Sequence, residues 1–503
     1  MAWEIIWNSL LSVCTPVNLF ILTASTIIGI TIGAMPGLTA TMGVALALPL
    51  TFAMDPVSSL ILLIGIYCGG IYGGSITAIL MKTPGTPAAA ATAIDGFELA
   101  KQGKARKALE MALWASVFGG IASFFALILI APQLAKFALK FGPPELACLA
   151  LFGLTIIISM SSGSLIKGLI AGCIGLGMSF IGIDKIESCV RFGFGNADLM
   201  NGLRLVPCMI GMFAMSQVFT QFEDIFANEG KIVPKIVAGE RLAFREFFAE
   251  LGNLIRGSVI GILVGAMPGT GSTIASFLNY NEAKRTSKDR ENIGKGSLSG
   301  VCASEVANNA VTGAAFIPLL TLGIPGDVTT AVILGALMMQ GLIPGTALFT
   351  EHQEFVYPTM LAFLLANIAM GICGTALIGI FSRIVEIPGK CLTPVIAALC
   401  VIGSYAINNS FFDVTVMIVC AFAGYLLPKA GFPTVPILIG FILGPVFETN
   451  FRNALIMSKG SYLIFVTRPI ALFFLAVAGI FLGMAMVKTY KASKTMQERE
   501  VME

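Results

Sequence analysis

Four apolar stretches of the sequence end at a Pro-Gly pair, and hydroxyl or carboxylate side chains follow each pair. A helix that restarts after Pro-Gly presents unpaired backbone N–H groups and the positive end of its dipole, which suits a carboxylate ligand. The hydroxyls can either cap the helix or hydrogen-bond the ligand, and the two roles carry equal weight. We expect the following residues to face a carboxylate: Pro36, Gly37, Thr39 and Thr41 at the first break, Lys82, Thr83, Pro84, Gly85 and Thr86 at the second, Pro268, Gly269, Thr270, Gly271, Ser272 and Thr273 at the third, and Pro325 and Gly326 at the fourth. Lys82 has an alternative role, in which it extends to the membrane interface.

Other polar residues suggest a site for a coupling cation. Asp327 directly follows the fourth break, where it could coordinate a cation with Thr329 or Thr330. Asn308 and Asn309 lie within an apolar helix, and their amide oxygens suit sodium or the substrate. Glu305 precedes them by about one turn. A membrane carboxylate is a functional hypothesis by default, but we favour an interfacial position near a cytoplasmic loop for this one.

The breaks belong to an internal duplication. Residues 29–37 (GITIGAMPG) and 261–269 (GILVGAMPG) are identical at seven of nine positions, with an offset of 232 (261 − 29). The second and fourth breaks lie in residues 72–87 and 313–328, with an offset of 241 (313 − 72). A single break would favour simple close packing of small residues, whereas four breaks at matched places favour a function. Interrupted helices in a bilayer are tolerated where they line a cavity or are covered by protein.

The composition places these elements in a membrane. Hydrophobic residues make up 56% of the 503 residues and charged residues only 12%, against about 25% charged in a soluble domain. Apolar runs long enough for the roughly 20 residues of a spanning helix predict an all-α polytopic membrane protein with about a dozen crossings or half-crossings. The net charge of +3, without a basic block, gives no indication of nucleic-acid binding. The first helix lacks the preceding basic residues of a cleaved signal peptide, so we expect it to be retained.

The inventory of reactive residues argues against an enzyme. The single histidine, His352, excludes a His-rich metal centre, and the eleven cysteines lack the spacing of a zinc site or a disulfide framework. Residues 268–273 have no Lys before their hydroxyls, and an ATPase signature is missing. We therefore expect no cofactor, and energy from an ion gradient, carried by Na⁺ or H⁺.

Charge placement predicts that the two halves are inverted. Residues 101–107 are basic, while the equivalent residues 342–354 contain no Lys or Arg. Residues 284–295 are also basic, while the equivalent residues 49–58 carry only one charge, Asp55. Because short cytoplasmic loops are enriched in Lys and Arg, equivalent loops are expected on opposite faces. The predicted organisation is a first repeat at 1–222, a charged linker at 223–250, a second repeat at 251–460, and an extra helix with a cytoplasmic tail at 461–503. Whether 17–52 and 253–279 are re-entrant hairpins or double crossings stays open.

Several of these motifs together resemble one family. They are the two GAMPG phrases, residues 72–76 (YGGSI) leading to 83–87 (TPGTP), residues 93–96 (AIDG), and residues 307–310 (ANNA) leading to 323–326 (GIPG). Over nearly the whole chain the sequence resembles the large membrane subunit of the bacterial tripartite tricarboxylate transporters. The resemblance implies a multi-pass protein of the bacterial inner membrane, a small four-helix membrane subunit as partner, and a periplasmic solute-binding protein that delivers citrate or another carboxylate.

The predicted function is therefore carboxylate uptake by cation symport, with Na⁺ the cation implied by the family. The carboxylate and the cation would bind between the broken elements of the two halves. Three alternatives remain: an ion-coupled carboxylate transporter that works without a binding protein, a passive anion channel, and a structural or assembly protein of the membrane.

Overall fold

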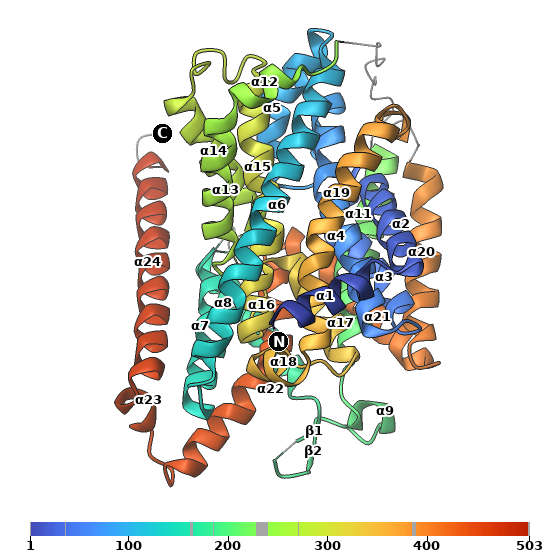
Figure 1. Cartoon of the computed structure of the whole chain (residues 1–503). Coiled ribbons are helices and arrows are strands. Elements are labelled where there is room, and N and C mark those ends of the chain that lie inside the picture. The colour runs from blue at the N-terminus through green and yellow to red at the C-terminus, as the bar shows by residue number, and fades with distance from the viewer. Residues whose placement is uncertain are drawn as a thin grey trace. The chain divides into compact units, whose positions relative to one another are not determined.

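The computed structural model describes residues 2–35, 37–160, 164–184, 186–227, 240–269, 271–384 and 389–500. These residues are almost entirely helical (Figure 1), and eight helices are long and apolar enough to cross a membrane. The chain is thus an all-α polytopic membrane protein, as predicted. It divides into two compact units, residues 1–137 with 213–410 and residues 138–212 with 411–503, so each unit takes segments from both halves of the sequence.

The first unit contains the four Pro-Gly breaks. Its helices are α1 (Ala2–Val13), α2 (Pro16–Gly33), α3 (Ala40–Thr51), α4 (Pro56–Met81), α5 (Ala89–Lys101), α6 (Ala105–Ala138), α11 (Ser216–Ala227), α12 (Phe244–Ala249), α13 (Leu251–Gly265), α14 (Gly271–Thr286), α15 (Leu298–Ala314), α16 (Phe316–Leu322), α17 (Val328–Met339), α18 (Thr346–Glu351), α19 (Gln353–Ile384) and α20 (Gly389–Ala406).

The second unit is smaller and carries a short loop hairpin. Its elements are α7 (Pro143–Met160), α8 (Leu165–Ser179), β1 (Gly182–Ile183), β2 (Val190–Arg191), α9 (Ala197–Met200), α10 (Leu205–Met209), α21 (Phe411–Lys429), α22 (Thr434–Met457), α23 (Ile464–Thr467) and α24 (Pro469–Glu500), and a π-helix at Ile210–Met215 joins α10 to α11. Helix α22 packs against α7 and α8, and α24 packs against α7.

Helices α2 and α3 form a helical hairpin. The hydroxyl of Ser58, at the start of α4, donates to the amide oxygen of Asn18, at the start of α2, over 2.6 Å. Thr51 ends α3, and its carbonyl accepts from the hydroxyl of Ser59, so α3 returns to the end at which α2 began. The 12 residues of α3 span about 18 Å, too short for a hydrocarbon core of about 30 Å. The hairpin therefore enters and leaves on one side.

Helices α13 and α14 form the equivalent hairpin of the second half. The Ser287 hydroxyl, just after α14, donates to the side-chain oxygen of Asn253 near the start of α13 over 2.9 Å. Arg256, one turn further along α13, donates to the carbonyl of Glu282 near the end of α14. Residues 17–52 and 253–279 thus each form a helical hairpin whose two outer ends lie at the same end of the unit.

Glycines let each hairpin lie close to a long helix. A side chain at Gly29 or Gly33 of α2 would collide with the backbone of α4, at the Ile66 and Gly70 carbonyl oxygens. Gly261 and Gly265 of α13 lie equally close to α15, at Ala307 and Val311. The duplicated glycines therefore do serve helix packing, in addition to leading into the breaks.

The long helices α4 and α15, which the duplication makes equivalent, run antiparallel. Tyr67 in the first half of α4 pairs with Asp327 beyond the end of α16, whereas Ser75, further along α4, pairs with Glu305 near the start of α15. Asp95 of α5, which follows α4, reaches Ser297 at the start of α15. Equivalent helices that run in opposite directions are what inverted repeats require.

The loops gather by charge at the two ends of this unit. The Gln102 side chain donates to the Lys295 carbonyl, which joins the two basic loops. At the other end the Gln340 side chain donates to the Thr51 carbonyl over 2.7 Å, which joins the two loops that lack Lys and Arg. Figure 1 places α5 and α12 at one end and α17 and α18 at the other. This arrangement supports the predicted inversion.

Candidate functional site

Within each half, the hairpin tip touches the second break. In the first half the Gly85 backbone is so close to Gly33 that a side chain at Gly85 would lie 2.4 Å from the Gly33 carbonyl oxygen. In the second half the Gly269 N–H donates to the Gly326 carbonyl over 2.9 Å. The two Pro-Gly breaks of a half are thus one structural element.

The two halves meet through hydroxyls of different breaks. The Thr41 and Thr329 hydroxyls lie 2.7 Å apart, which connects the hairpin of the first half with the restarted helix α17 of the second. Next to Thr329, Asp327 caps α17 by accepting from the Thr330 N–H at 2.7 Å, and its other carboxylate oxygen accepts from the Tyr67 hydroxyl at 2.5 Å. Three of the predicted break residues are therefore brought to one place, which we call the hydroxyl junction: Thr41, Thr329 and Asp327, with Tyr67 as a partner that the sequence did not reveal.

Several other predicted residues hold the breaks in shape. The Thr39 hydroxyl accepts from the Met42 N–H and caps α3, and the Thr83 hydroxyl donates to the Met81 carbonyl. Lys82 is exposed in a left-handed conformation, with its ammonium 5.7 Å from the centre of the Phe97 ring. Pro84 is half-buried beside Lys82 and Thr83.

The third break is described only in part. Pro268 is buried at the hairpin tip, and Gly271, Ser272 and Thr273 are half-buried at the start of α14. At the fourth break, Pro325 is buried beside Gly326. Pro36 and Thr270 lie outside the described residues.

A second polar group surrounds Glu305, and we call it the Glu305 cluster. Glu305 is fully buried inside the protein, and our expectation that it lies near the interface stays a prediction. Its carboxylate accepts from three hydroxyls on three helices: from Ser75 of α4 at 2.6 Å, from Ser116 of α6 at 3.1 Å, and from Thr92 of α5. The Asn309 amide donates to the Ser116 hydroxyl at 2.7 Å. The predicted Asn309 thus belongs to this cluster and not to the hydroxyl junction.

Some polar atoms near this cluster have no partner. Thr86 and Asn308 are 5% and 0% exposed. Within the described part of the chain, the Thr86 hydroxyl and both amide atoms of Asn308 make no hydrogen bond of ordinary geometry, and neither does the Asn309 oxygen. Buried polar groups are normally paired, so these atoms are free to bind a ligand.

Sequence reasoning missed three kinds of residue. Ser75, Thr92 and Ser116 are single hydroxyls in apolar helices, and only the folded arrangement directs them to one carboxylate. Gln221 holds the first hairpin tip by donating to the Gly37 carbonyl over 3.1 Å. Asp95 accepts from the N–H groups of Gly294, Gly296 and Ser297, and from the Tyr280 hydroxyl. The motif at 93–96 was the available signal for Asp95.

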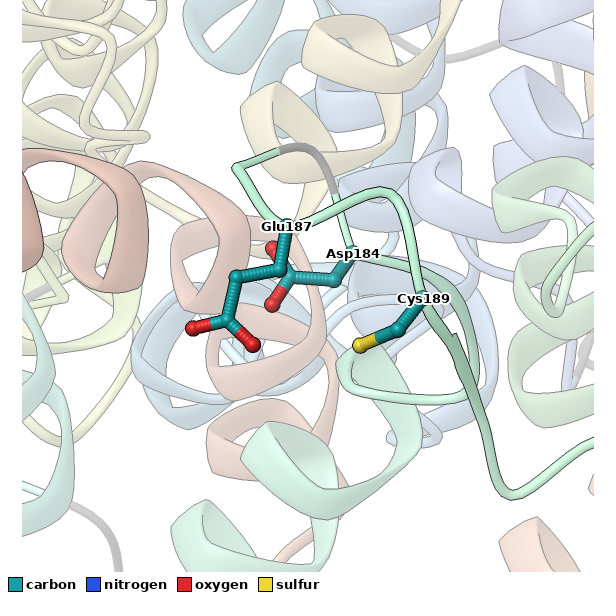
Figure 2. Close-up of side chains that lie close together, drawn as sticks. All are labelled: Asp184, Glu187 and Cys189. Atoms are coloured by element: carbon teal, nitrogen blue, oxygen red, sulfur yellow. The ribbon is translucent and has the colours of Figure 1, made fainter.

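In the second unit, Asp184, Glu187 and Cys189 lie close together on the β1–β2 loop (Figure 2). The carboxylates are already paired, since Asp184 contacts Arg191 and Arg452 and Glu187 contacts Arg452. The Ile186 N–H and the Arg452 guanidinium lower the pKa of Asp184 to about 2. Its charge therefore persists at any ordinary pH, and the arginines supply the positive charge that a metal would bring. The group fastens the loop to α22 rather than forming a metal site.

The chain was compared with known proteins. A model of the tripartite tricarboxylate transporter TctA family matches residues 19–439. The chain is 39% identical over 463 residues to an uncharacterised 52.8 kDa protein of Agrobacterium vitis in the TAR-I ttuC′ 3′ region, and the match covers 92% of each chain. It is 37% identical over 234 residues to a protein of the same organism in the TAR-II ttuC′ 3′ region, over 46% of this chain and 97% of that relative. No solved structure matches.

Proposed function

The chain belongs to the tripartite tricarboxylate transporter TctA family, a family of membrane transporters of the bacterial inner membrane, and from this membership we propose the following function. It is the translocating subunit of a secondary transporter that takes up tricarboxylates or related carboxylates together with a cation, Na⁺ in the first instance. A small membrane subunit and a periplasmic solute-binding protein complete the system.

The contact between the hairpin of one half and a break of the other carries this proposal. The Thr41 and Thr329 hydroxyls, 2.7 Å apart, lie where two helices begin, at Thr39 and Asp327. Helix starts and hydroxyls are the donors that a carboxylate needs. The two hairpins come from opposite ends of the unit, an arrangement that suits alternating access.

Uptake into proteoliposomes tests the function. The chain is reconstituted with its small subunit and binding protein, and a panel of labelled di- and tricarboxylates is offered with and without a Na⁺ gradient. We expect uptake that requires the binding protein and stops when the gradient is collapsed. Uptake that continues without a gradient would indicate a channel, and uptake that does not need the binding protein would indicate a transporter that works alone.

Single substitutions test the site. Thr41→Val, Thr329→Val and Thr273→Val keep the side-chain shape and remove a hydroxyl, so membrane insertion should persist. Loss of a hydrogen bond to a charged ligand costs about 1.5–3 kcal/mol, which predicts uptake roughly tenfold or more lower at subsaturating substrate. Full uptake by all three variants would refute the proposed site. Thr23→Val, at a half-buried position of α2 outside the breaks, is the control.

A further inference from the structure

The duplication makes two buried polar pairs equivalent, but only one of the two pairs is hydrogen-bonded in the structure. With the offset of 241, Tyr67 is equivalent to Asn308 (67 + 241) and Thr86 to Asp327 (86 + 241). In one pair the Tyr67 hydroxyl donates to Asp327 over 2.5 Å. In the equivalent pair, the Thr86 hydroxyl and the Asn308 amide are buried without a hydrogen bond of ordinary geometry, and the Asn308 side chain lies beside the Glu305 carboxylate. The polar groups of Tyr67 and Asp327 therefore pair with each other, whereas those of Asn308 and Thr86 do not.

The second pair, Asn308 and Thr86, lies beside the Glu305 carboxylate. A side chain at Gly74 would lie 2.9 Å from Thr86, and the next residue, Ser75, donates to Glu305. Asn308 follows Glu305 by one turn of α15. Thr86, Glu305 and Asn308 are therefore neighbours around one stretch of α4, whereas Tyr67 lies two turns further back along that helix.

The charge at this position is not balanced by a basic residue. Glu305 is fully buried, and no described Lys, Arg or His forms an ion pair with it. Burial of a carboxylate is expensive unless it is paired and hydrogen-bonded. The Ser75, Thr92 and Ser116 hydroxyls supply hydrogen bonds, but the ionised carboxylate is stable here only with a cation beside it, and otherwise the carboxyl holds a proton.

We propose that Glu305 and Asn308, with the hydroxyls of Thr86, Ser75 and Thr92 around them, bind the coupling Na⁺ ion. All donors are oxygens, which hard cations prefer, and the single carboxylate charge balances one positive charge. The equivalent position at Tyr67 and Asp327 is closed by its own hydrogen bond, so the cation is bound on one side of the internal two-fold axis only. This proposal rests on the proposed function, because it assigns a place to the cation of that symport.

Binding can be measured without transport. The purified full-length protein in detergent is melted over a series of NaCl concentrations, with choline chloride holding the ionic strength constant. A ligand that binds only the folded state raises the melting temperature by mass action. We expect Na⁺ to raise it in the wild type and KCl to raise it less. No Na⁺-dependent rise, or an equal rise with K⁺, would overturn the assignment.

Three variants locate the site. Glu305→Gln keeps the size of the side chain and removes its charge, and Asn308→Leu keeps the shape and removes the unpartnered amide. We expect the Na⁺ concentration for half of the stabilisation to rise about tenfold or more in both, because each loses a ligand to a charged group. If Asn308 had only a structural role, removing an unsatisfied amide would leave the Na⁺ response unchanged while the protein became more stable.

Tyr67→Phe is the matched control, since Tyr67 occupies the position equivalent to Asn308. We expect its Na⁺ response to equal that of the wild type. A response lost in Tyr67→Phe but kept in Asn308→Leu would place the cation at the other position and overturn the proposal. If Glu305→Gln yields no folded protein, Asn308→Leu and Tyr67→Phe still decide between the two positions.

The outcome for the Na⁺ site can be told apart from the outcome for the proposed carboxylate transport. A Na⁺ response that Asn308→Leu weakens, in a wild type that takes up no carboxylate, would leave this site standing and refute the proposed transport. Uptake driven by Na⁺ whose dependence on Na⁺ is unchanged in Asn308→Leu would leave the transport standing and refute this site.

Discussion

Asp95 joins the two halves of the chain more firmly than any residue of the breaks. It is fully buried, and one carboxylate oxygen accepts from three backbone N–H groups at the start of α15 while the other accepts from Tyr280. Three converging N–H groups form an anion-binding concavity. A first-half carboxylate thus organises the loop that precedes Glu305 and Asn308.

Asp95→Asn should therefore destabilise the protein strongly. The amide is uncharged, and hydrogen bonds to a charged acceptor are about twice as strong as neutral ones, so we expect a loss of roughly 3 kcal/mol. Tyr280→Phe removes one of the four bonds, and we expect about 1 kcal/mol. The apparent melting temperature in detergent gives the order wild type, Tyr280→Phe, Asp95→Asn. Equal melting temperatures for all three would mean that this contact contributes little.

Gly85 is the residue on which the packing of the first two breaks depends. The added methyl group of Gly85→Ala would lie 2.4 Å from the Gly33 carbonyl oxygen and 2.8 Å from the Gly74 Cα, and backbone atoms cannot move aside easily. Overpacking of this kind costs about 1–3 kcal/mol. We expect less folded protein in the membrane and a lower melting temperature. Gly252→Ala is the control, because no atom lies within 4 Å of its added methyl group. A Gly85→Ala variant as stable as Gly252→Ala would contradict the close contact.

At the scale of elements, the breaks and their duplication could be predicted from the sequence, but their partners could not. Identical phrases such as 29–37 and 261–269 are local, and Pro and Gly end helices wherever they occur. The contact of Thr41 with Thr329 spans 288 residues, and nothing in the local pattern encodes it. The burial of Glu305 could not be predicted for the same reason, because the hydroxyls that surround it come from three other helices.

The direction of the hairpins leads to a prediction about which loops share a compartment. The basic loops meet at one end of the first unit, where Gln102 donates to the Lys295 carbonyl, and the loops without Lys or Arg meet at the other, where Gln340 donates to the Thr51 carbonyl. Because basic loops favour the cytoplasm, cysteines placed at Lys104 and Lys288 should react with a membrane-impermeant maleimide only from the cytoplasmic side.

Cysteines at Ala53 and Ala347 should react only from the opposite side. All four positions are exposed, and the background needs replacement of the exposed Cys14, Cys173 and Cys189. Labelling of 104 and 347 from the same side would contradict the inversion, and with it the carboxylate site between the halves.

For the whole molecule, the compact units do not coincide with the repeats, because each unit contains parts of both halves of the chain. The first unit combines residues 1–137 with 213–410, and the second combines 138–212 with 411–503. The two hairpins therefore lie in one unit although they come from different halves. Contacts such as Ser75 with Glu305 and Asp95 with Ser297 make each half dependent on the other.

This dependence predicts how a divided chain behaves. A cut in the linker 223–250, for example after residue 234, gives two fragments, neither of which contains a complete compact unit. Expressed alone, each would have to fold with the buried Asp95 or Glu305 left without its partners, at a cost of several kcal/mol for an unpaired buried charge. We expect each fragment alone to be degraded, and the two expressed together to co-purify from membranes and to regain carboxylate uptake. Asp95→Asn in the first fragment should weaken co-purification, while Gly252→Ala in the second should not. A first fragment that is stable and monodisperse on its own would show that the repeats fold independently, and the cation site between α4 and α15 would then lose its structural basis.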